Sequence, residues 1–318
     1  MNRQCHNHLH NMAVSDILNI ISSTLNLFNA SVEDSIKSMA AYLQTLLKKI
    51  DVDENGNVKV DVANLNLIST IKEKLTSSIL TAKYLGAASK FIAGFGIVAG
   101  IQDAYYENSE PSATSKALLK AAKDAVIDRI SGDGLTENVV NGVIDILRKG
   151  ITSGAGYANL QDQIFEFIGS VGDPQNSFFV KYVKQVSTDA INQFGRQYAY
   201  TASADLGLTW FRYAGSNIQT TRPFCLACTE RQYFNIKEIP DLLKGDFPEF
   251  AANGGDLYAK TGLPQGMYPE TDTGNFHALL GGYNCGHQYR PVSDDIVPEK
   301  IKKAFAEKYG IQPGAVTK

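Results

Sequence analysis

"FFVKYVKQVSTDAINQFGRQYAYTAS", residues 178–203, is the stretch that decides the fold class. Its large apolar side chains recur at intervals of three to five residues, at Phe179, Val183, Val186, Ile191, Phe194 and Tyr198. Such intervals place apolar side chains on one face of an α-helix. The stretch therefore predicts a long amphipathic helix of about 25 residues.

The same periodicity runs through the residues upstream of this helix. It predicts helical segments over residues 15–49, 64–107, 116–130, 137–151 and 159–169, separated by breaks that contain glycine or proline. Ser31, with Asp34 three residues later, resembles a capping box, so a new helix is expected to begin at Ser31. Asn55–Gly56 predicts a tight turn between two short extended segments.

The residue pattern changes after Leu206, where prolines, glycines and aromatic residues replace the helical periodicity. We expect a flexible N-terminal tail over residues 1–13, a helical domain over 14–205, a compact Cys/His module over 206–295, and a C-terminal helix and tail over 296–318. The predicted fold class is mainly α, an extended multi-helix domain followed by a small loop-rich α+β module. The tail contains Cys5, His6, His8 and His10, but no apolar pattern that would hold metal ligands in place.

The composition limits the classes of function. The chain is 44% hydrophobic and 20% charged, with a net charge of −3, which is not the basic profile of a bulk nucleic-acid binder. The most apolar run, Phe91–Ile101, is shorter than the ~20 residues that a bilayer requires, so no membrane partner is expected. The N-terminal residues lack the apolar segment of a signal peptide, and cysteines are few, which favours assembly in a reducing compartment.

Cysteine and histidine gather in the predicted module. Cys225 and Cys228 have the two-residue spacer of a zinc knuckle, and Cys285 and His287 would share one face of a strand. Together they predict a closed four-ligand site for a structural zinc ion that staples the module. Ordinary buried cysteines with a partly exposed histidine, or a disulfide, are the alternatives. His277 is a fifth candidate, as a replacement ligand or a neighbour of the site. Arg222 and Arg290 flank these segments and are expected to be structural, pairing with backbone carbonyls or carboxylates.

Two segments of the module resemble a known family. "FRYAGSNIQTTRPFCLAC" and "GGYNCGHQYRPVS" are similar to the C-terminal module of tailed-phage minor head proteins, the Mu protein F-like or phage head morphogenesis family. The matching residues are Thr221, Arg222, Pro223, Cys225, Cys228, Cys285, His287, Pro291 and Val292. Residues ~50–107 are also similar, through an "NGN" turn followed by helices. Gly286 stands where the family usually has arginine.

The resemblance implies a virion structural protein without catalytic residues. Such proteins lie in several copies inside the head near the portal, contact portal and major capsid proteins, and act in head assembly or in DNA packaging and ejection. They are made in the host cytoplasm.

An alternative function is a metal-dependent nuclease of the His-Asn-His type, for which His277, Asn284 and His287 supply the residue types. That function requires one histidine free to act as a general base. A third alternative is a toxin-like effector that uses the module for delivery, and it would be expected to carry a further C-terminal domain.

Overall fold

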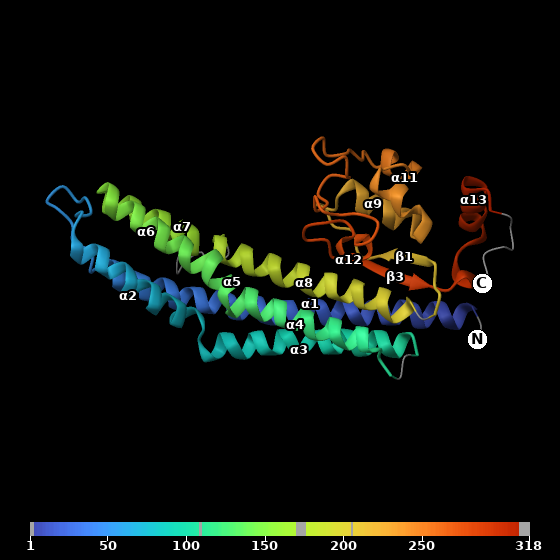
Figure 1. Ribbon diagram of the computed structural model, residues 1–318, viewed down its shortest axis with the longest axis horizontal. Coiled ribbons are helices and arrows are strands. Elements are labelled where there is room, and N and C mark those ends of the chain that lie inside the picture. The colour runs from blue at the N-terminus through green and yellow to red at the C-terminus, as the bar shows by residue number, and fades with distance from the viewer. Residues whose placement is uncertain (1–2, 108–109, 170–175, 205, 312–318) are drawn as a thin grey trace. The chain divides into compact units, whose positions relative to one another are not determined.

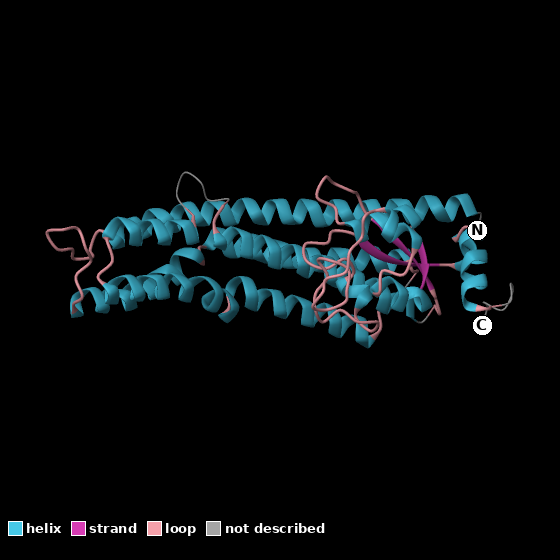
Figure 2. Ribbon diagram, turned by 90° about the horizontal axis from the view of Figure 1, so that it is seen from above, coloured by secondary structure: helices cyan, strands magenta, loops and turns pink. Residues whose placement is uncertain are grey.

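A computed structural model describes residues 3–107, 110–169, 176–204 and 206–311, with residues 3–14 described by their backbone alone. The chain is mainly helical and contains one small antiparallel sheet (Figures 1 and 2). This confirms the predicted fold class as mainly α with a small α+β part. The long helices are α1 (Arg3–Leu47), α2 (Val62–Ile79), α3 (Ala82–Tyr105), α4 (Ala113–Ser131), α6 (Asn141–Ser153), α7 (Tyr157–Ile168), α8 (Phe178–Ala204) and α13 (Glu299–Tyr309).

Short elements complete the fold. The short helices are α5 (Asp133–Leu135), α9 (Pro223–Arg231), α10 (Ile239–Leu243), α11 (Pro248–Ala252) and α12 (Phe276–Leu279). One turn of π-helix lies at η1 (Thr136–Val140), and single turns of 3₁₀-helix lie at η2 (Ile236–Glu238) and η3 (Asp294–Ile296). The strands are β1 (Trp210–Ala214), β2 (Tyr233–Asn235) and β3 (Gln288–Val292).

The amphipathic helix predicted over residues 178–203 is confirmed as α8. Phe179, Val183, Ile191, Phe194 and Tyr198 are buried along it, which is the face that the sequence periodicity marked. The turn at residues 55–56 is also confirmed. Gly56 has a φ of +77°, a left-handed conformation that glycine adopts without strain, and Val52 pairs with Val58 across the turn.

The first helix differs from the prediction. α1 runs without a break from Arg3 to Leu47, so it begins in the segment expected as a tail and has no new start at Ser31. Ser31 is buried, and its carbonyl accepts a hydrogen bond from the Ser35 hydroxyl at 3.0 Å. Asp34 forms an ion pair with Lys83 at 2.5 Å instead of capping a helix. Tertiary contacts have therefore overridden the local capping signal.

The chain divides into two compact units. The first comprises Met1–Ile21, Phe95–Lys120 and Asp189–Lys318, and the second comprises Ser22–Gly94 and Ala121–Thr188. The first unit thus joins the loop-rich module to parts of α1, α3, α4 and α8. The boundary predicted at residue 205 is not a boundary between these units.

The second unit is a helical bundle with an aliphatic and aromatic core. Phe28 stacks on Phe91 with ring centroids 5.1 Å apart. The buried Tyr84 hydroxyl donates a hydrogen bond to the carbonyl oxygen of Ile130 at 2.6 Å, which links α3 to α4. Burial of these large side chains supplies most of the stabilisation of such a bundle.

In the first unit, the sheet has the strand order β2-β1-β3, and β1 lies antiparallel to both neighbours. Alternation along β1 divides its side chains between two faces. Phe211 and Tyr213 belong to the core cluster that includes α9 residues, whereas Trp210 packs with Val292 and α13. Figure 1 shows β1 and β3 between α8 and the short helix α9, with α12 beside the strands. The closing helix expected after Pro298 is confirmed as α13.

α3 is the most apolar of the described long helices. By length and composition alone it could cross a membrane, with a hydropathy of 1.5 over a window of which 39% is buried. A core helix of a soluble protein meets the same criterion, so one such helix is weak evidence for a membrane span.

Candidate metal centre

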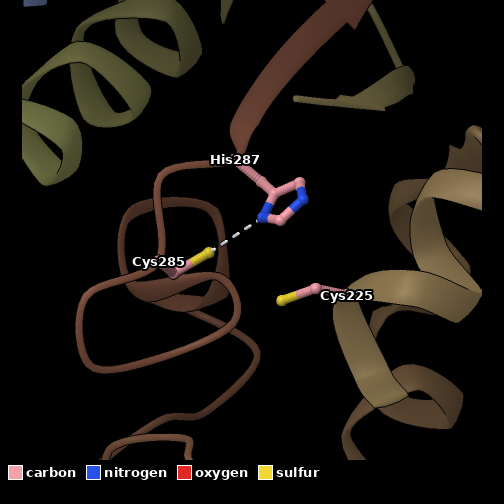
Figure 3. A group of neighbouring side chains, drawn as sticks. All are labelled: Cys225, Cys285 and His287. Carbon is pink, nitrogen blue, oxygen red and sulfur yellow. Dashed lines mark hydrogen bonds between the residues drawn. The ribbon is translucent and has the colours of Figure 1, made fainter. Parts of the chain in front are cut away.

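Cys225, Cys285 and His287 converge in the interior of the first unit. Cys225 lies in the first turn of α9, which Pro223 begins, and the other two lie in the loop that leads into β3. The two sulfurs and one imidazole nitrogen all lie within 4.8 Å of one another, and all three residues are buried. Figure 3 shows the three side chains pointing toward a common centre. This group could hold a metal ion.

The donor atoms are spaced as ligands of one ion would be. Cys285 Sγ lies 3.7 Å from His287 Nδ1. Ligands bound tetrahedrally to zinc at about 2.0–2.3 Å are separated from one another by about 3.5–3.8 Å. The thiols of Cys225 and Cys285 are both free, so the disulfide alternative is not observed. The donor atoms are of the kinds that bind zinc, and the distance between Cys285 Sγ and His287 Nδ1 matches that of two ligands of one ion.

The imidazole of His287 is oriented by a second layer of polar groups. Its Nε2 lies 3.3 Å from Asn217 Oδ1, and the amide of Asn217 in turn donates a hydrogen bond to the Thr229 hydroxyl at 2.9 Å. If Nε2 carries the hydrogen and donates it to this carbonyl oxygen, Nδ1 presents a lone pair toward Cys285. Metal-bound histidines are commonly held in this way by a carbonyl or carboxylate on the far nitrogen.

Arg196 of α8 forms hydrogen bonds to the ligand loop, residues 280–287, which contains Cys285 and His287. Its guanidinium donates hydrogen bonds to the carbonyl oxygens of His287 and Ala278, both at 2.8 Å, and to that of Cys285. The side chain is almost fully buried. The ion pairs found among the described residues do not include Arg196, so its positive charge remains available to an anionic site nearby.

The pKa values of the two cysteine thiols are shifted in opposite directions. A hydrogen bond from Cys225, together with the positive charge of Arg196, lowers the pKa of Cys285, although burial acts in the opposite direction. The hydrogen bond to Cys285 and burial raise the pKa of Cys225. Cys285 is therefore the more acidic of the two thiols, and the thiolate is the form that binds metal ions.

Two glycines lie so close to the predicted ligands that no side chain would fit at their positions. A Cβ atom on Gly281 would lie 2.5 Å from Cys225 Sγ and 3.0 Å from Cys285 Sγ. A Cβ atom on Gly215 would lie 2.7 Å from Cδ2 of His287. Any larger residue at either position would displace a predicted ligand.

The structure does not bring Cys228 into the group. The Cys-x-x-Cys segment forms the helix α9 rather than a knuckle turn, and Cys228, one turn after Cys225, is fully buried in the apolar core cluster. Cys285 and His287 are also not on a strand as predicted, because β3 begins at Gln288. They meet Cys225 because the loop, rather than a pleated strand, directs both side chains inward.

The other candidate residues have separate partners. His277 Nε2 lies 2.7 Å from Gln197 Oε1, its ring stacks on Tyr200, and it is not a member of the group. The backbone amide of Asn284 donates to Asp189 Oδ1 at 2.8 Å. His277, Asn284 and His287 are therefore engaged in three different sets of contacts.

The two arginines that flank the ligand segments make structural contacts. Arg222 donates to the carbonyl oxygens of Gly281, at 2.8 Å, and Tyr283, as predicted. The buried Arg290 donates to Gln102 Oε1 at 3.1 Å, a side-chain amide rather than the carbonyl or carboxylate that was expected.

Sequence reasoning missed several residues that build the site. Arg196, Tyr213 and Asn217 belong to segments that showed no metal-ligand pattern, and only the fold places them beside the ligands. The Gly281–Gly282 pair was the one local signal, since paired glycines often mark a close approach of the backbone.

Comparison of the chain with protein-family models, curated proteins and solved structures finds no match.

Proposed function

We propose that Cys225, Cys285 and His287 hold a zinc ion that fastens α9 to the loop before β3, and that this ion has a structural rather than a catalytic role. The observation that carries the proposal is the convergence of two thiols and an imidazole in a buried site. Zinc binding would contribute directly to the folding free energy of the module.

Zinc suits this set of donor atoms better than other common ions. Thiolate and imidazole ligands favour zinc over magnesium or calcium, which prefer oxygen ligands. Two thiolates neutralise the charge of the divalent ion in a buried place where an unpaired charge would be costly. The second layer formed by Asn217 and Thr229 resembles the outer shell of known zinc sites.

The wider function that we propose is that of a minor head protein of a tailed phage. It would lie in several copies in the virion, inside the head near the portal, where it would assist head assembly or DNA packaging and ejection. Its partners would be portal and major capsid proteins, with packaged DNA as a further contact. The support is the resemblance of residues 211–228 and 281–293, the same segments that contribute the three buried donor atoms.

The nuclease alternative has less support from the geometry. A hydrolytic His-Asn-His site needs a histidine that is free to accept a proton from water. His277 is buried against Tyr200 and Gln197, and burial lowers its pKa to about 4. His287 belongs to the Cys/His group.

Metal analysis of the purified full-length protein tests the metal proposal. We expect one zinc ion per chain, retained in Cys228→Ala and lost in Cys225→Ser and Cys285→Ser. The Cys228→Ala protein is the matched control, because it removes a buried thiol of the same helix that lies outside the group. Wild-type protein without stoichiometric zinc, or zinc that survives both serine substitutions, would refute the proposal.

Assembly tests the wider proposal. The protein would be co-expressed with portal and major capsid proteins from the same genome, and the heads would be purified by sedimentation. We expect the wild-type chain to sediment with the heads and Cys285→Ser to be depleted from them. A chain that stays outside the heads would contradict the minor head proposal. DNA cleavage that is abolished by His277→Ala would favour the nuclease instead.

A further inference from the structure

Three protein ligands leave one vertex of a tetrahedral zinc site without a named donor. We propose that the hydroxyl oxygen of Tyr213 occupies this vertex, so that the centre has the ligands Cys225, Cys285, His287 and Tyr213. The inference rests on the proposed zinc site and extends it with a ligand that no sequence motif marks.

The position of the hydroxyl carries the inference. The Tyr213 hydroxyl lies 3.1 Å from Cys225 Sγ and 3.8 Å from Cys285 Sγ. In a tetrahedral site with zinc–sulfur bonds of about 2.3 Å and zinc–oxygen bonds of about 2.0 Å, oxygen and sulfur ligands lie about 3.5 Å apart. The two observed distances bracket this value. The oxygen thus lies at ligand-like distances from two of the three proposed ligand atoms, and the metal would replace the hydrogen bond that the hydroxyl donates to Cys225 Sγ.

Tyr213 is held firmly in this position. It lies on the central strand of the sheet, paired with Tyr289 of β3, and its backbone amide donates to the Gln232 carbonyl oxygen at 2.7 Å. Its ring meets Phe224 edge to face, with centroids 6.2 Å apart. The side chain is buried, so the hydroxyl cannot leave the sulfurs without disturbing the core.

The backbone of Gly281 closes one side of this group. A Cβ atom on Gly281 would lie within 3.0 Å of the Tyr213 hydroxyl as well as of both sulfurs, so the backbone of Gly281 covers the face formed by these three atoms. Cys228, the other nearby thiol, does not belong to the group. Tyr213 is therefore the protein donor that best fits the fourth position.

The charges are consistent with this ligand set. On binding, Zn²⁺ would replace three protons, those of the Cys225 and Cys285 thiols and of the Tyr213 hydroxyl, and the protons would pass to solvent. Two thiolates, one phenolate and a neutral imidazole give the centre a net charge of −1. The buried guanidinium of Arg196, bonded to the carbonyl of Cys285, supplies the compensating positive charge. A centre closed in this way has no open position for a substrate water, which a hydrolytic zinc site requires.

Cobalt substitution of the full-length protein tests the fourth ligand, because Co²⁺ in place of zinc reports its ligands in visible absorption. We expect wild-type protein to show thiolate charge-transfer bands and four-coordinate bands that azide leaves unchanged. Tyr213→Phe should keep the thiolate bands, shift the other bands and respond to azide, since its fourth position would be open. Its zinc affinity should fall at least tenfold, roughly the loss seen when supporting groups of a metal site are removed. Tyr289→Phe, a buried tyrosine on the neighbouring strand, should behave as wild type.

The outcomes separate this inference from the site itself. Absence of thiolate bands in wild-type protein would refute the zinc site as a whole. Thiolate bands with an azide response in wild-type protein would assign the vertex to water and overturn only the role of Tyr213. Identical, azide-insensitive spectra in wild type and Tyr213→Phe would assign it to another side chain. If Tyr213→Phe failed to fold, the ultraviolet difference spectrum of wild-type protein on zinc addition would decide, because only a coordinated tyrosine adds a phenolate band.

Discussion

Two glycines near Cys285 have opposite surroundings. Gly281 lies against both sulfurs, whereas a Cβ atom on Gly286 would have no neighbour within 4 Å. Glycine is thus required sterically at position 281 and is not required at position 286, although Gly286 lies between two ligands. The open space around Gly286 leaves room for a side chain at this position.

This contrast gives a residue-scale prediction. Gly281→Ala should weaken zinc binding at least tenfold and lower the free energy of unfolding by about 1–3 kcal/mol, the usual cost of overpacking. Gly286→Ala should change neither. Chelator competition would measure the affinity, and urea denaturation would measure the stability. Equal effects of the two substitutions would contradict the packing argument.

His277 gives a second prediction, on pH. Burial lowers its pKa to about 4, whereas in the unfolded chain the value is about 6.5. The unfolded state therefore binds the extra proton first, and the stability associated with the neutral ring is complete above about pH 6.5 and is lost as the pH falls toward about 4. The full loss would be on the order of 3 kcal/mol at the acid end.

Urea denaturation of wild-type protein and His277→Gln over this pH range isolates the effect. The stability difference between the two proteins should narrow or reverse as the pH falls, because glutamine does not titrate. Release of zinc in acid acts on both proteins and cancels in the comparison. A constant difference between pH 7 and pH 4 would show that His277 does not carry this dependence.

At the scale of elements, α8 connects the helical part of the first unit to the ligand loop. Arg196 projects from it and donates hydrogen bonds to the carbonyl groups of His287 and Cys285 in the loop and of Ala278 in α12. Buried carbonyl groups without partners are costly, so this one side chain determines whether the loop can remain folded. The loop in turn positions Cys285 and His287.

Arg196→Met should therefore destabilise the protein by about 1–3 kcal/mol for each buried carbonyl group that loses its donor. Arg196→Lys should recover only a part, because an ammonium group cannot reproduce the planar fork of donors. Hydrogen exchange should show the loss first at residues 278–287. The exposed Arg148→Met serves as the control, and a similar loss there would point to a general effect of removing an arginine.

Elements differ in how far the sequence predicts them. α8 was predictable because its buried face recurs over its whole length. The continuity of α1 was not, since the partner that engages Asp34 is Lys83, distant in the sequence. Cys225, Cys285 and His287 were identified from their chemistry, whereas Cys228, proposed from the Cys-x-x-Cys spacing, lies outside the group that the structure brings together. Tyr213 and Asn217 could not be found without the fold, because strand pairing and the loop after β1 bring them to the ligands.

At the scale of the whole molecule, the module does not form a compact unit by itself. The first unit adds Met1–Ile21, Phe95–Lys120 and Asp189–Ala204 to the residues after 205, and Gln102 and Arg196 lie in two of these added segments. Gln102 bonds both to the Gly195 carbonyl oxygen, at 2.5 Å, and to Arg290 of β3. Loss of the metal should therefore be felt beyond the loop-rich residues.

Chelation of the full-length protein, followed by hydrogen exchange, tests this organisation. Removing zinc should lower protection at residues 223–231 and 278–292 most strongly, because the ion would no longer join α9 to the loop. Through Arg196 the effect should extend into α8 over residues 189–204, across the sequence boundary at 205. Residues 22–94 and 121–188 should keep their protection, since they form the second unit. The Cys285→Ser protein, treated in parallel, should already show the chelated pattern and should not respond to chelator. If α8 responded uniformly from residue 178 to residue 204, or if only the residues after 205 responded, metal-dependent stability would not follow the two units, and Arg196 would not couple the helix to the site.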